Sequence, residues 1–402
     1  MSEQSSHSLS SIRTYLGLNR NIGILAVSTF LLGLGEELWQ AFLPKYLFEL
    51  GASSLVIGLF ASLRDLLDGL YQYPGGWIND RFGRKKTLML FTGIAMSGYV
   101  VFAFSSHWSF LFAGLVLVMG WKSGAFPATF AVIGDALPKG QRSVAFSVQS
   151  ILVRVPRVIG APIGGLLIAG LGMLAGMHTA FAITIGLATL VLFTQHRFYK
   201  EQHQEASGFS HTPLKHVFRN MPTALKRLLV AECFVRVGEG LSLAFIILYV
   251  TEVMQFSVSA YGALYAIQQS VAIAFYIPSG KLADLTGRKP LVALTFLFFA
   301  LFPLAVKFSG SFVALVFAFL VGGLKEFGEP ARKSLIVDLS DPNQVGRTVG
   351  MYYMIRNLLV VPAGTVGGLL WQISPELTMY ISSAVGIIGL LVFLATGKSH
   401  DH

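Results

Sequence analysis

Charged side chains inside long apolar stretches are the residues of this chain best suited to chemistry. The cations are Arg64, Lys122, Arg154, Arg157, Arg236, Lys325 and Arg356, and the anions are Glu36, Glu37, Asp65, Asp68, Glu232, Glu239, Glu326 and Glu329. Such groups offer ionic chemistry, because guanidinium and ammonium groups bind carboxylates or phosphates and carboxylates exchange protons. The sequence shows no nucleophile elbow, phosphate-binding glycine loop or histidine pair at metal spacing. It therefore predicts neither an enzyme nor a metal or cofactor site.

The stretches that carry these charges are long enough to cross a membrane. Apolar residues make up 54% of the chain and charged residues 12%, with a mean hydropathy of +0.65, which leaves too little polar surface for a soluble globule. The hydrophobicity is continuous rather than alternating, which favours helices over barrel strands. We therefore predict an all-α polytopic membrane protein with twelve transmembrane helices, near 22–48, 55–77, 87–104, 109–134, 144–169, 173–194, 228–252, 258–280, 291–307, 312–337, 347–373 and 376–396.

The chain repeats itself at half its length. The stretch from Gly76 to Lys86 returns 204 positions later, between Gly280 and Pro290. At an offset of 203, identical residues recur in two further helix pairs: Glu36, Leu38, Tyr46, Glu49, Lys122, Pro127 and Asp135 match Glu239, Leu241, Tyr249, Glu252, Lys325, Pro330 and Asp338. We expect two pseudo-symmetric six-helix bundles at 22–194 and 228–396, a cytoplasmic linker at 195–227, and short tails at 1–21 and 397–402.

The basic residues predict the orientation of the chain. Most of the 30 Lys and Arg residues, Arg332 among them, fall in one set of loops and tails, whereas the other set holds only Lys45 and Lys307. This bias places both termini and the repeated motif in the cytoplasm. The net charge of +10 then reflects topology and attraction to membrane lipids rather than nucleic-acid binding. Short loops favour a prokaryotic plasma (inner) membrane, and we expect the chain to work as a monomer.

Burying these charges in lipid would cost far too much. At about 3 kcal/mol each, all of them together would cost on the order of 45 kcal/mol, several times a typical folding stability. They must face one another or water. They lie in the first, second, fourth, fifth, seventh, tenth and eleventh helices, whereas every third helix carries no charged residue in its apolar span. This pattern predicts a central cavity between two bundles, with the third, sixth, ninth and twelfth helices at the periphery.

Several of these side chains are candidates for binding a solute. Arg154 and Arg157 are spaced i, i+3, and two guanidinium groups on one helix face suit a carboxylate or phosphate. The other expected binding residues are Lys122, Lys325, Arg356, Trp39 and Trp121, because each tryptophan lies within one turn of a charge. The spacing also allows i, i+4 pairs, among them Glu232 with Arg236 and Lys325 with Glu329. Internal salt bridges between helices are the alternative for the paired charges.

Four carboxylates are candidates for coupling to protons: Glu36, Asp68, Glu239 and Glu326. Glu36 and Glu239 are equivalent in the repeat and lie in glycine-rich runs of the first helix of each half. A carboxylate in a desolvated cavity can serve as a reversible proton carrier, because burial changes its proton affinity.

The repeated loop resembles the signature of a known family. With Gly76, Asp80, Arg81, Gly83, Arg84, Lys85 and Lys86 between the second and third helices, residues 20–396 resemble the major facilitator superfamily of secondary transporters. The resemblance implies that Asp80 and Arg84 lock the cytoplasmic side in one conformation. The remaining gating residues that it implies are Gly76, Arg81, Gly83, Asp135, Asp284 and Arg288, although Leu285 replaces Arg81 in the second copy.

The resemblance implies alternating-access transport of a small organic solute. Residues Gly160-Ala161-Pro162-Ile163-Gly164-Gly165 partly reproduce an element of drug:proton antiporters, whereas Val116–Gly120 lacks the arginine found there in those proteins. We therefore expect proton-coupled transport, with export by antiport slightly favoured. A proton symporter or uniporter that takes up an organic anion or metabolite, and a non-transporting receptor, are the alternatives.

Overall fold

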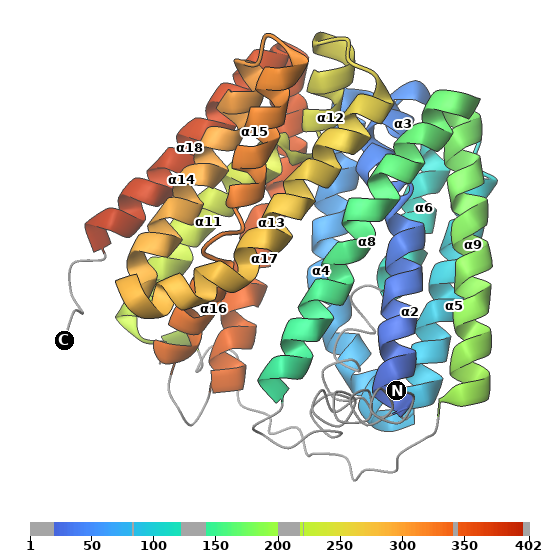
Figure 1. The fold of residues 1–402 in the computed structure, drawn as a ribbon, viewed down its shortest axis with the longest axis horizontal. Helices are drawn as coiled ribbons and strands as arrows, with labels where there is room; N and C mark the ends of the chain where they lie inside the picture. Colours follow the sequence, from blue (N-terminus) through green and yellow to red (C-terminus); the bar gives the residue numbers. More distant parts are fainter. Residues whose placement is uncertain are drawn as a thin grey trace, which may run out of the picture. The chain divides into compact units, whose positions relative to one another are not determined.

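The structure is a computed structural model that describes residues 20–82, 84–121, 142–199, 218–219, 221–340 and 345–396. Within these residues the secondary structure is helical (Figure 1). The first half contains α2(Arg20–Glu37), η1(Gln40–Phe42), α3(Leu43–Glu49), α4(Ser54–Phe82), α5(Arg84–Ala103), α6(Trp108–Met119), α8(Arg142–Leu171) and α9(Met173–Phe198). The second half contains α11(Thr223–Leu243), α12(Ile246–Leu248), η4(Tyr249–Val253), α13(Val258–Thr286), α14(Arg288–Lys307), α15(Phe312–Leu324), α16(Glu329–Asp338), α17(Val345–Ile373) and α18(Pro375–Thr396).

Each of the twelve expected apolar segments contains a helix in the part of the chain that the structure describes. Six helices there are long and apolar enough to cross a membrane, and a seventh span forms if the bent pair Thr223–Leu243 and Ile246–Val253 is counted as one. The expected segments at 22–48, 228–252 and 312–337 are each divided into shorter helices. The first and the third of these breaks reflect local sequence. Pro44 and Pro330 lie in the first turns of α3 and α16, where the backbone N–H that proline lacks has no partner within the helix.

The helices pack as two units. Unit 1 contains residues 1–40 and 67–208, and unit 2 contains residues 41–66 and 209–402. The repeat places residues 41–66 in the first bundle, but these residues pack with unit 2. One continuous helix, α4, therefore contributes residues to both units.

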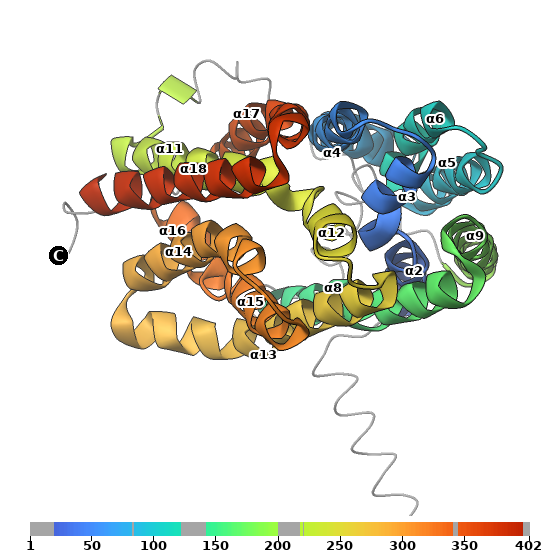
Figure 2. The same ribbon diagram turned by 90° about the horizontal axis from the view of Figure 1, so that it is seen from above.

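In unit 1, α2 packs against α8 and α9, and α5 packs against α6 and α9 (Figure 2). Close approaches depend on small residues, as in other helical membrane proteins. The hydroxyl of Thr184 on α9 donates a hydrogen bond of 2.8 Å to the carbonyl oxygen of Gly35 on α2. A Cβ atom at Gly35 would lie 2.9 Å from Thr184, so a larger residue would push α2 and α9 apart.

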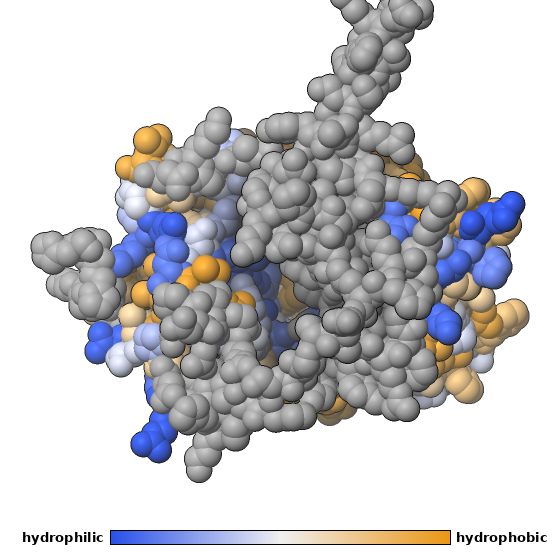
Figure 3. All heavy atoms as spheres, turned by 90° about the horizontal axis from the view of Figure 1, so that it is seen from below, coloured by the Kyte–Doolittle hydropathy of each residue, from blue (hydrophilic) through white to orange (hydrophobic). Residues whose placement is uncertain are grey.

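Unit 2 repeats this packing. α11 packs against α17 and α18, and α14 packs against α15, α16 and α18. The hydroxyl of Ser382 on α18 donates a hydrogen bond of 2.6 Å to the carbonyl oxygen of Gly238, the repeat equivalent of Gly35. The end of the molecule seen in Figure 3 carries patches of hydrophilic side chains bordered by hydrophobic ones, as expected where helix ends meet water and helix sides meet lipid.

Candidate functional site

A break in the tenth apolar segment positions the charged residues of unit 2. α15 ends at Leu324 and α16 begins at Glu329. Gly328 fits between them because a Cβ atom there would lie 2.3 Å from the carbonyl oxygen of Leu291, and its backbone N–H donates to the hydroxyl of Thr295 at 2.6 Å. Broken helices expose backbone and side-chain charges at mid-membrane, where transporters place their binding sites.

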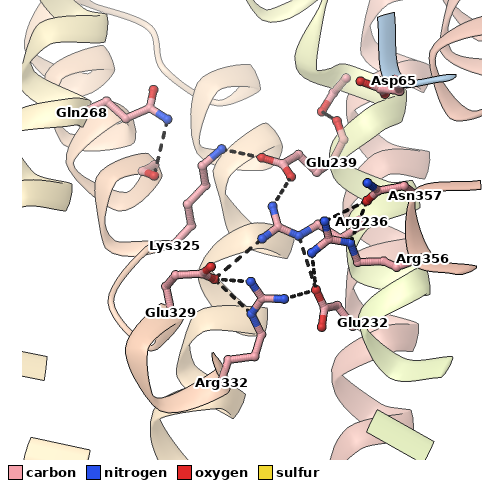
Figure 4. A network of polar contacts seen from close by, with 12 residues as sticks. Asp65, Glu232, Arg236, Glu239, Gln268, Lys325, Glu329, Arg332, Arg356 and Asn357 are labelled. Atoms are coloured by element: carbon pink, nitrogen blue, oxygen red, sulfur yellow. Dashed lines mark hydrogen bonds and ion pairs between the residues drawn. The ribbon is translucent and has the colours of Figure 1, made fainter. Parts of the chain in front are cut away.

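Lys325 follows the end of α15 and reaches the first helix of its half. Its ammonium group lies 2.6 Å from Oε1 of Glu239 on α11, and its side chain is 8% exposed (Figure 4). The rings of Phe299 and Phe302 lie 5.2 Å and 5.6 Å from the same nitrogen, within the range of cation–π attraction. Arg236 donates to the second oxygen, Oε2, of Glu239 at 2.8 Å. The carboxylate of Glu239 is thus held between two cations.

A second group of charges continues from this pair. Glu232, which is fully buried, accepts hydrogen bonds from Arg332 on α16, from Arg356 on α17 at 2.9 Å, and from the hydroxyl of Tyr352 at 2.5 Å. Arg332 is 2% exposed and also donates to Glu329. We call Glu232, Arg236, Glu239, Lys325, Glu329, Arg332 and Arg356 the ion-pair network (Figure 4). It joins α11, α16 and α17 through the interior of unit 2.

The ion-pair network can bind charged groups and exchange protons, but it offers no nucleophile. Four cations face three carboxylates within it, and Glu326 lies close enough to Arg236 to act on it electrostatically. Arg236 also lies 3.9 Å from both Glu232 and Glu329, so one guanidinium is near three carboxylates. In such an arrangement the cations can change partner, because a cation whose carboxylate loses its charge still lies beside other carboxylates. Rearrangement of ion pairs is therefore the chemistry that this site can perform.

The first-half candidates lie in unit 1. Glu36, 6% exposed, accepts a hydrogen bond of 2.7 Å from the hydroxyl of Tyr99 on α5. Trp39 is 3% exposed and packs against Tyr99, Phe102 and Phe181, with ring centroids 6.1, 5.4 and 5.5 Å away. The structure therefore places Trp39 inside an aromatic cluster in this conformation.

The predicted arginines of α8 differ in their contacts. Arg157 ion-pairs with Glu37 on α2, with Nε 3.2 Å from Oε1, and its side chain is 30% exposed. Arg154 is half-buried one turn earlier on α8, Asp68 is half-buried on α4, and Trp121 is 9% exposed just beyond α6.

The gating motif is described in part. Lys122, Gly83 and Asp135 lie outside the described residues, and only the backbone is described for Gly76, Asp80, Arg81, Arg84 and Asp284, all of it helical. In the second copy, Gly287 has a φ of +83°, which favours glycine, and Arg288 begins α14 directly after it. Arg288 forms an ion pair with Asp338, the last residue of α16. Asp338 is the repeat equivalent of the predicted gating residue Asp135.

Two interpretations of the sequence need correction. Lys325 pairs with Glu239 rather than with Glu329, because the break between α15 and α16 removes the helical spacing that the i, i+4 rule requires. The charge bias of the loops predicts that Arg332 is a cytoplasmic loop cation, but Arg332 lies in α16 and is buried. Its spacing of three residues from Glu329, inside the predicted segment 312–337, is the signal that could have identified it.

A further ion cluster lies at the other end of unit 2. Lys45 on α3 has its ammonium group 2.6 Å from Glu49 and 2.6 Å from Glu252, and its side chain is 9% exposed. Glu49 and Glu252 are equivalent in the repeat, whereas the equivalent of Lys45 is Leu248. One lysine therefore holds two symmetry-related carboxylates. We call these three residues the Lys45 clamp.

Also within unit 2, α4 and α17 approach each other through small residues. A Cβ atom at Gly58 would lie 2.3 Å from the carbonyl oxygen of Gly364, and one at Gly368 would lie 2.5 Å from that of Ser54. The hydroxyl oxygens of Ser62 and Thr365 are 2.8 Å apart. This close crossing, made by residues four apart on each helix, is typical of tight helix pairs in membranes.

Comparison with known proteins gives consistent matches over the whole chain. The family model described as Major Facilitator Superfamily matches residues 25–232 and 228–401. An uncharacterized MFS-type transporter of Methanocaldococcus jannaschii is 25% identical over 94% of this chain and 95% of its own length. A multi-drug resistance efflux pump PmrA homolog of Lactococcus lactis is 27% identical over 93% of this chain and 92% of its own. Among solved structures, a point mutant of the nucleoside transporter NupG superposes with a TM-score of 0.82, at 13% identity, covering 94% of this chain and all of that one. The fold predicted from the sequence is thereby confirmed.

Proposed function

The chain belongs to the major facilitator superfamily, a family of transporters rather than enzymes, and we propose that it is a proton-coupled secondary transporter that exports a small organic solute by alternating access. The observation that carries this proposal is the ion-pair network, in which ionisable side chains are buried among hydrophobic helices. Charges at that depth are costly, and in membrane proteins they mark pathways for solutes, ions or protons.

We assign the proton-coupling role in unit 2 to Glu239, with Glu326 beside it. Glu239 is the carboxylate of the network with the most exposed side chain, 17% against 0% for Glu232 and 10% for Glu329. Water can therefore reach it most easily. A proton on Glu239 would remove the partner of Lys325, and its ammonium group would then pair with Glu329. Glu36 and Asp68 are the corresponding proposals in unit 1.

The solute site that we propose uses cations and aromatic rings. Lys325 and Arg356 border the network in unit 2, and Arg154 and Arg157 lie on α8 in unit 1. Trp39, Trp121 and Lys122 are the further candidates in the first half, and cations beside aromatic rings would suit an organic molecule with hydrogen-bond acceptors and an apolar body.

Alternating access requires contacts that form in one conformation and part in another. The Lys45 clamp and the crossing of α4 with α17 are suited to this role, because both join residues of the first repeat to helices of the second. By the orientation predicted from the basic residues, they would close the non-cytoplasmic side. The pair Arg288–Asp338 and the motif around Asp80 and Arg84 would act on the cytoplasmic side.

Export is supported by the names of relatives, since the Lactococcus lactis protein is called an efflux pump. The glycine-rich element Gly160–Gly165 within α8 supports the same direction. We place the protein in the plasma (inner) membrane with both termini in the cytoplasm, working as a monomer.

The test uses inside-out proteoliposomes that contain the internal pH dye pyranine, with ethidium as the transported probe. Proton-coupled export predicts ethidium uptake that depends on an imposed acid interior, together with an alkaline shift of pyranine when ethidium enters. Glu239→Gln should abolish both signals. Glu376→Gln, at the start of α18 outside the network, is the matched control and should retain them. Ethidium movement that is identical with and without a pH gradient would overturn the coupling, and binding without counterflow would identify a receptor.

A further inference from the structure

The crossing of α2 and α8 in unit 1 contains a buried carboxylate with an unused oxygen. Glu37 has a side chain 7% exposed, and its Oε1 atom lies 3.2 Å from Nε of Arg157. Its second oxygen, Oε2, is buried and has no hydrogen-bond partner. The helices meet closely at this point, because a Cβ atom at Gly160 would lie 2.8 Å from Cβ of Glu37. A buried oxygen without a donor is rare in proteins and requires an explanation.

Unit 2 has uncharged residues at the equivalent positions of its own helix crossing. At the repeat offset of 203, Glu37, Arg157 and Gly160 correspond to Gly240, Val360 and Ala363. The contacts correspond as well, since a Cβ atom at Gly240 would lie 2.8 Å from Cβ of Ala363 and 3.5 Å from Val360. The offset also holds beyond the crossing, where Gly-Gly-Leu-Leu occurs at 164–167 and again at 367–370.

The two crossings have charged and apolar residues, respectively, at equivalent positions, although both pack closely. At the level of Gly240 the α11–α17 crossing is closed by a glycine, a valine and an alanine, and the ion pair of these two helices, Glu232 with Arg356, lies two turns away on α11. A buried ion pair gives no stability advantage over apolar residues of that kind, because desolvation of both charges offsets their attraction. The pair Glu37–Arg157 is therefore not required for close packing at this level of the crossing. Both oxygens of Glu232 are engaged by donors, whereas Oε2 of Glu37 is not, and this difference points to a functional role for Glu37.

We propose that Glu37 is a proton-binding residue of unit 1 and that protonation of its Oε2 atom releases Arg157 from α2. A proton there neutralises the one carboxylate oxygen that no donor compensates, and it removes the charge that holds the guanidinium group. Arg157, already 30% exposed, then changes partner. This inference rests on the proposed proton coupling and adds to it a residue outside the ion-pair network.

The surroundings of Glu37 contain few other charges that could control it. α2 packs against α8 and α9. The charged or titratable residues in the described parts of these helices are Arg142, Arg154 and Arg157 on α8, and His178, His196 and Arg197 on α9. On α2 itself the neighbour is Glu36, which is engaged by Tyr99 of α5. Of these groups, Arg157 is the one seen in an ion pair with Glu37, so its guanidinium is the charge that a proton on Glu37 would affect first.

The experiment is infrared difference spectroscopy of the purified protein in detergent, titrated across the pH range in which it stays folded. A protonated buried carboxyl group gives a carbonyl band that ionised carboxylates lack, and the band shifts in deuterated water. We expect Glu37→Gln to remove one such band that Glu376→Gln leaves in place. A spectrum of Glu37→Gln identical to that of the wild type at every pH would overturn the proposal.

A second measurement tests whether the pair is structural. The double variant Glu37→Gly with Arg157→Val copies the unit 2 crossing, and its thermal midpoint should be close to that of the wild type. The thermal midpoint of Arg157→Val alone should be lower, because this variant leaves Glu37 unpaired. In ethidium transport, Glu37→Gln should lose the pH dependence of the wild type. A double variant as unstable as the single one would assign the pair to folding and overturn the inference. Wild-type vesicles without proton-coupled transport, but with the infrared band lost in Glu37→Gln, would overturn the proposed function and leave the proton-binding assignment standing.

Discussion

The glycine crossing of α4 and α17 should control how often that part of unit 2 opens. Gly58 lies where a Cβ atom would be 2.3 Å from the carbonyl oxygen of Gly364. In Gly58→Ala this contact must lengthen to about 3.3 Å, the ordinary carbon–oxygen separation, so the helices must part by about 1 Å. The contact partner is backbone, which cannot rotate out of the way.

The size of the effect follows from known costs of overpacking. Inserting a methyl group into a tight contact costs about 1–3 kcal/mol. The higher helix propensity of alanine, worth about 1 kcal/mol, acts equally in the closed and the open state and cancels in their ratio. With a central cost of about 2 kcal/mol, the opening equilibrium constant rises by about 30-fold, since 1.4 kcal/mol corresponds to a factor of ten.

The assay measures access to a residue that is buried only while the helices are closed. Ser62 is 7% exposed and contacts Thr365. With Cys233, the only cysteine, replaced by serine, Ser62→Cys can be labelled by N-ethylmaleimide only when α4 leaves α17. Gly58→Ala should raise the labelling rate by about 30-fold. The labelling should also become faster under conditions that drive transport.

The control is Gly350→Ala, on the same helix α17, where a Cβ atom would have no heavy atom within 4 Å. This variant should label at the parental rate. A labelling rate in Gly58→Ala equal to that in Gly350→Ala would refute the reasoning, because it would mean that the crossing does not limit opening. Fast labelling in both would mean that the helices are already apart in the membrane.

Three further predictions concern the charged clusters. Lys325→Gln or Glu239→Gln alone should each lower the free energy of unfolding by about 3–5 kcal/mol, and the double variant by clearly less than the sum, measured by denaturation in a double-mutant cycle. Arg332→Met should destabilise the protein by a similar amount, because it leaves two buried carboxylates without their shared cation; a thermal midpoint equal to that of wild type would contradict this. Lys45→Leu, which copies the repeat equivalent, should leave the carboxylates of Glu49 and Glu252 facing each other. Their repulsion should raise the rate of maleimide labelling of Ser62→Cys, and 1 M salt should lower that rate again by screening the repulsion.

Much of the fold could be predicted from the sequence, because long apolar segments and an internal repeat leave few alternatives. The helices fall where hydrophobicity indicates, and the repeat predicted that Glu239 and Glu36 would be first-helix carboxylates in both halves. The partners of those carboxylates could not be predicted. Glu239 pairs with Lys325 and Glu36 with Tyr99, and both contacts join helices that are distant in the sequence.

The buried Arg332 shows a different limit. A cation near the end of an apolar segment is expected to be exposed. In this protein the break at Gly328 starts a new helix, α16, and this helix carries Arg332 into the interior. The break depends on a backbone N–H donated to Thr295, a contact across 33 residues that no local pattern contains. The sequence shows Glu37 as one of the charges within the apolar segments, but it gives no sign of proton binding, because the unused oxygen of Glu37 is visible only in the structure.

One helix, α4, belongs to both packing units, and this gives it the geometry of a lever. Residues 54–66 pack in unit 2, and the residues from Leu67 onward belong to unit 1. The stretch from Ser54 to Tyr73 is about 30 Å long at 1.5 Å per residue. A tilt of about 10° would displace one end of such a rod by about 5 Å relative to the other. A separation of about 1 Å at Gly58 therefore needs only a few degrees of rotation of the stretch from Ser54 to Tyr73.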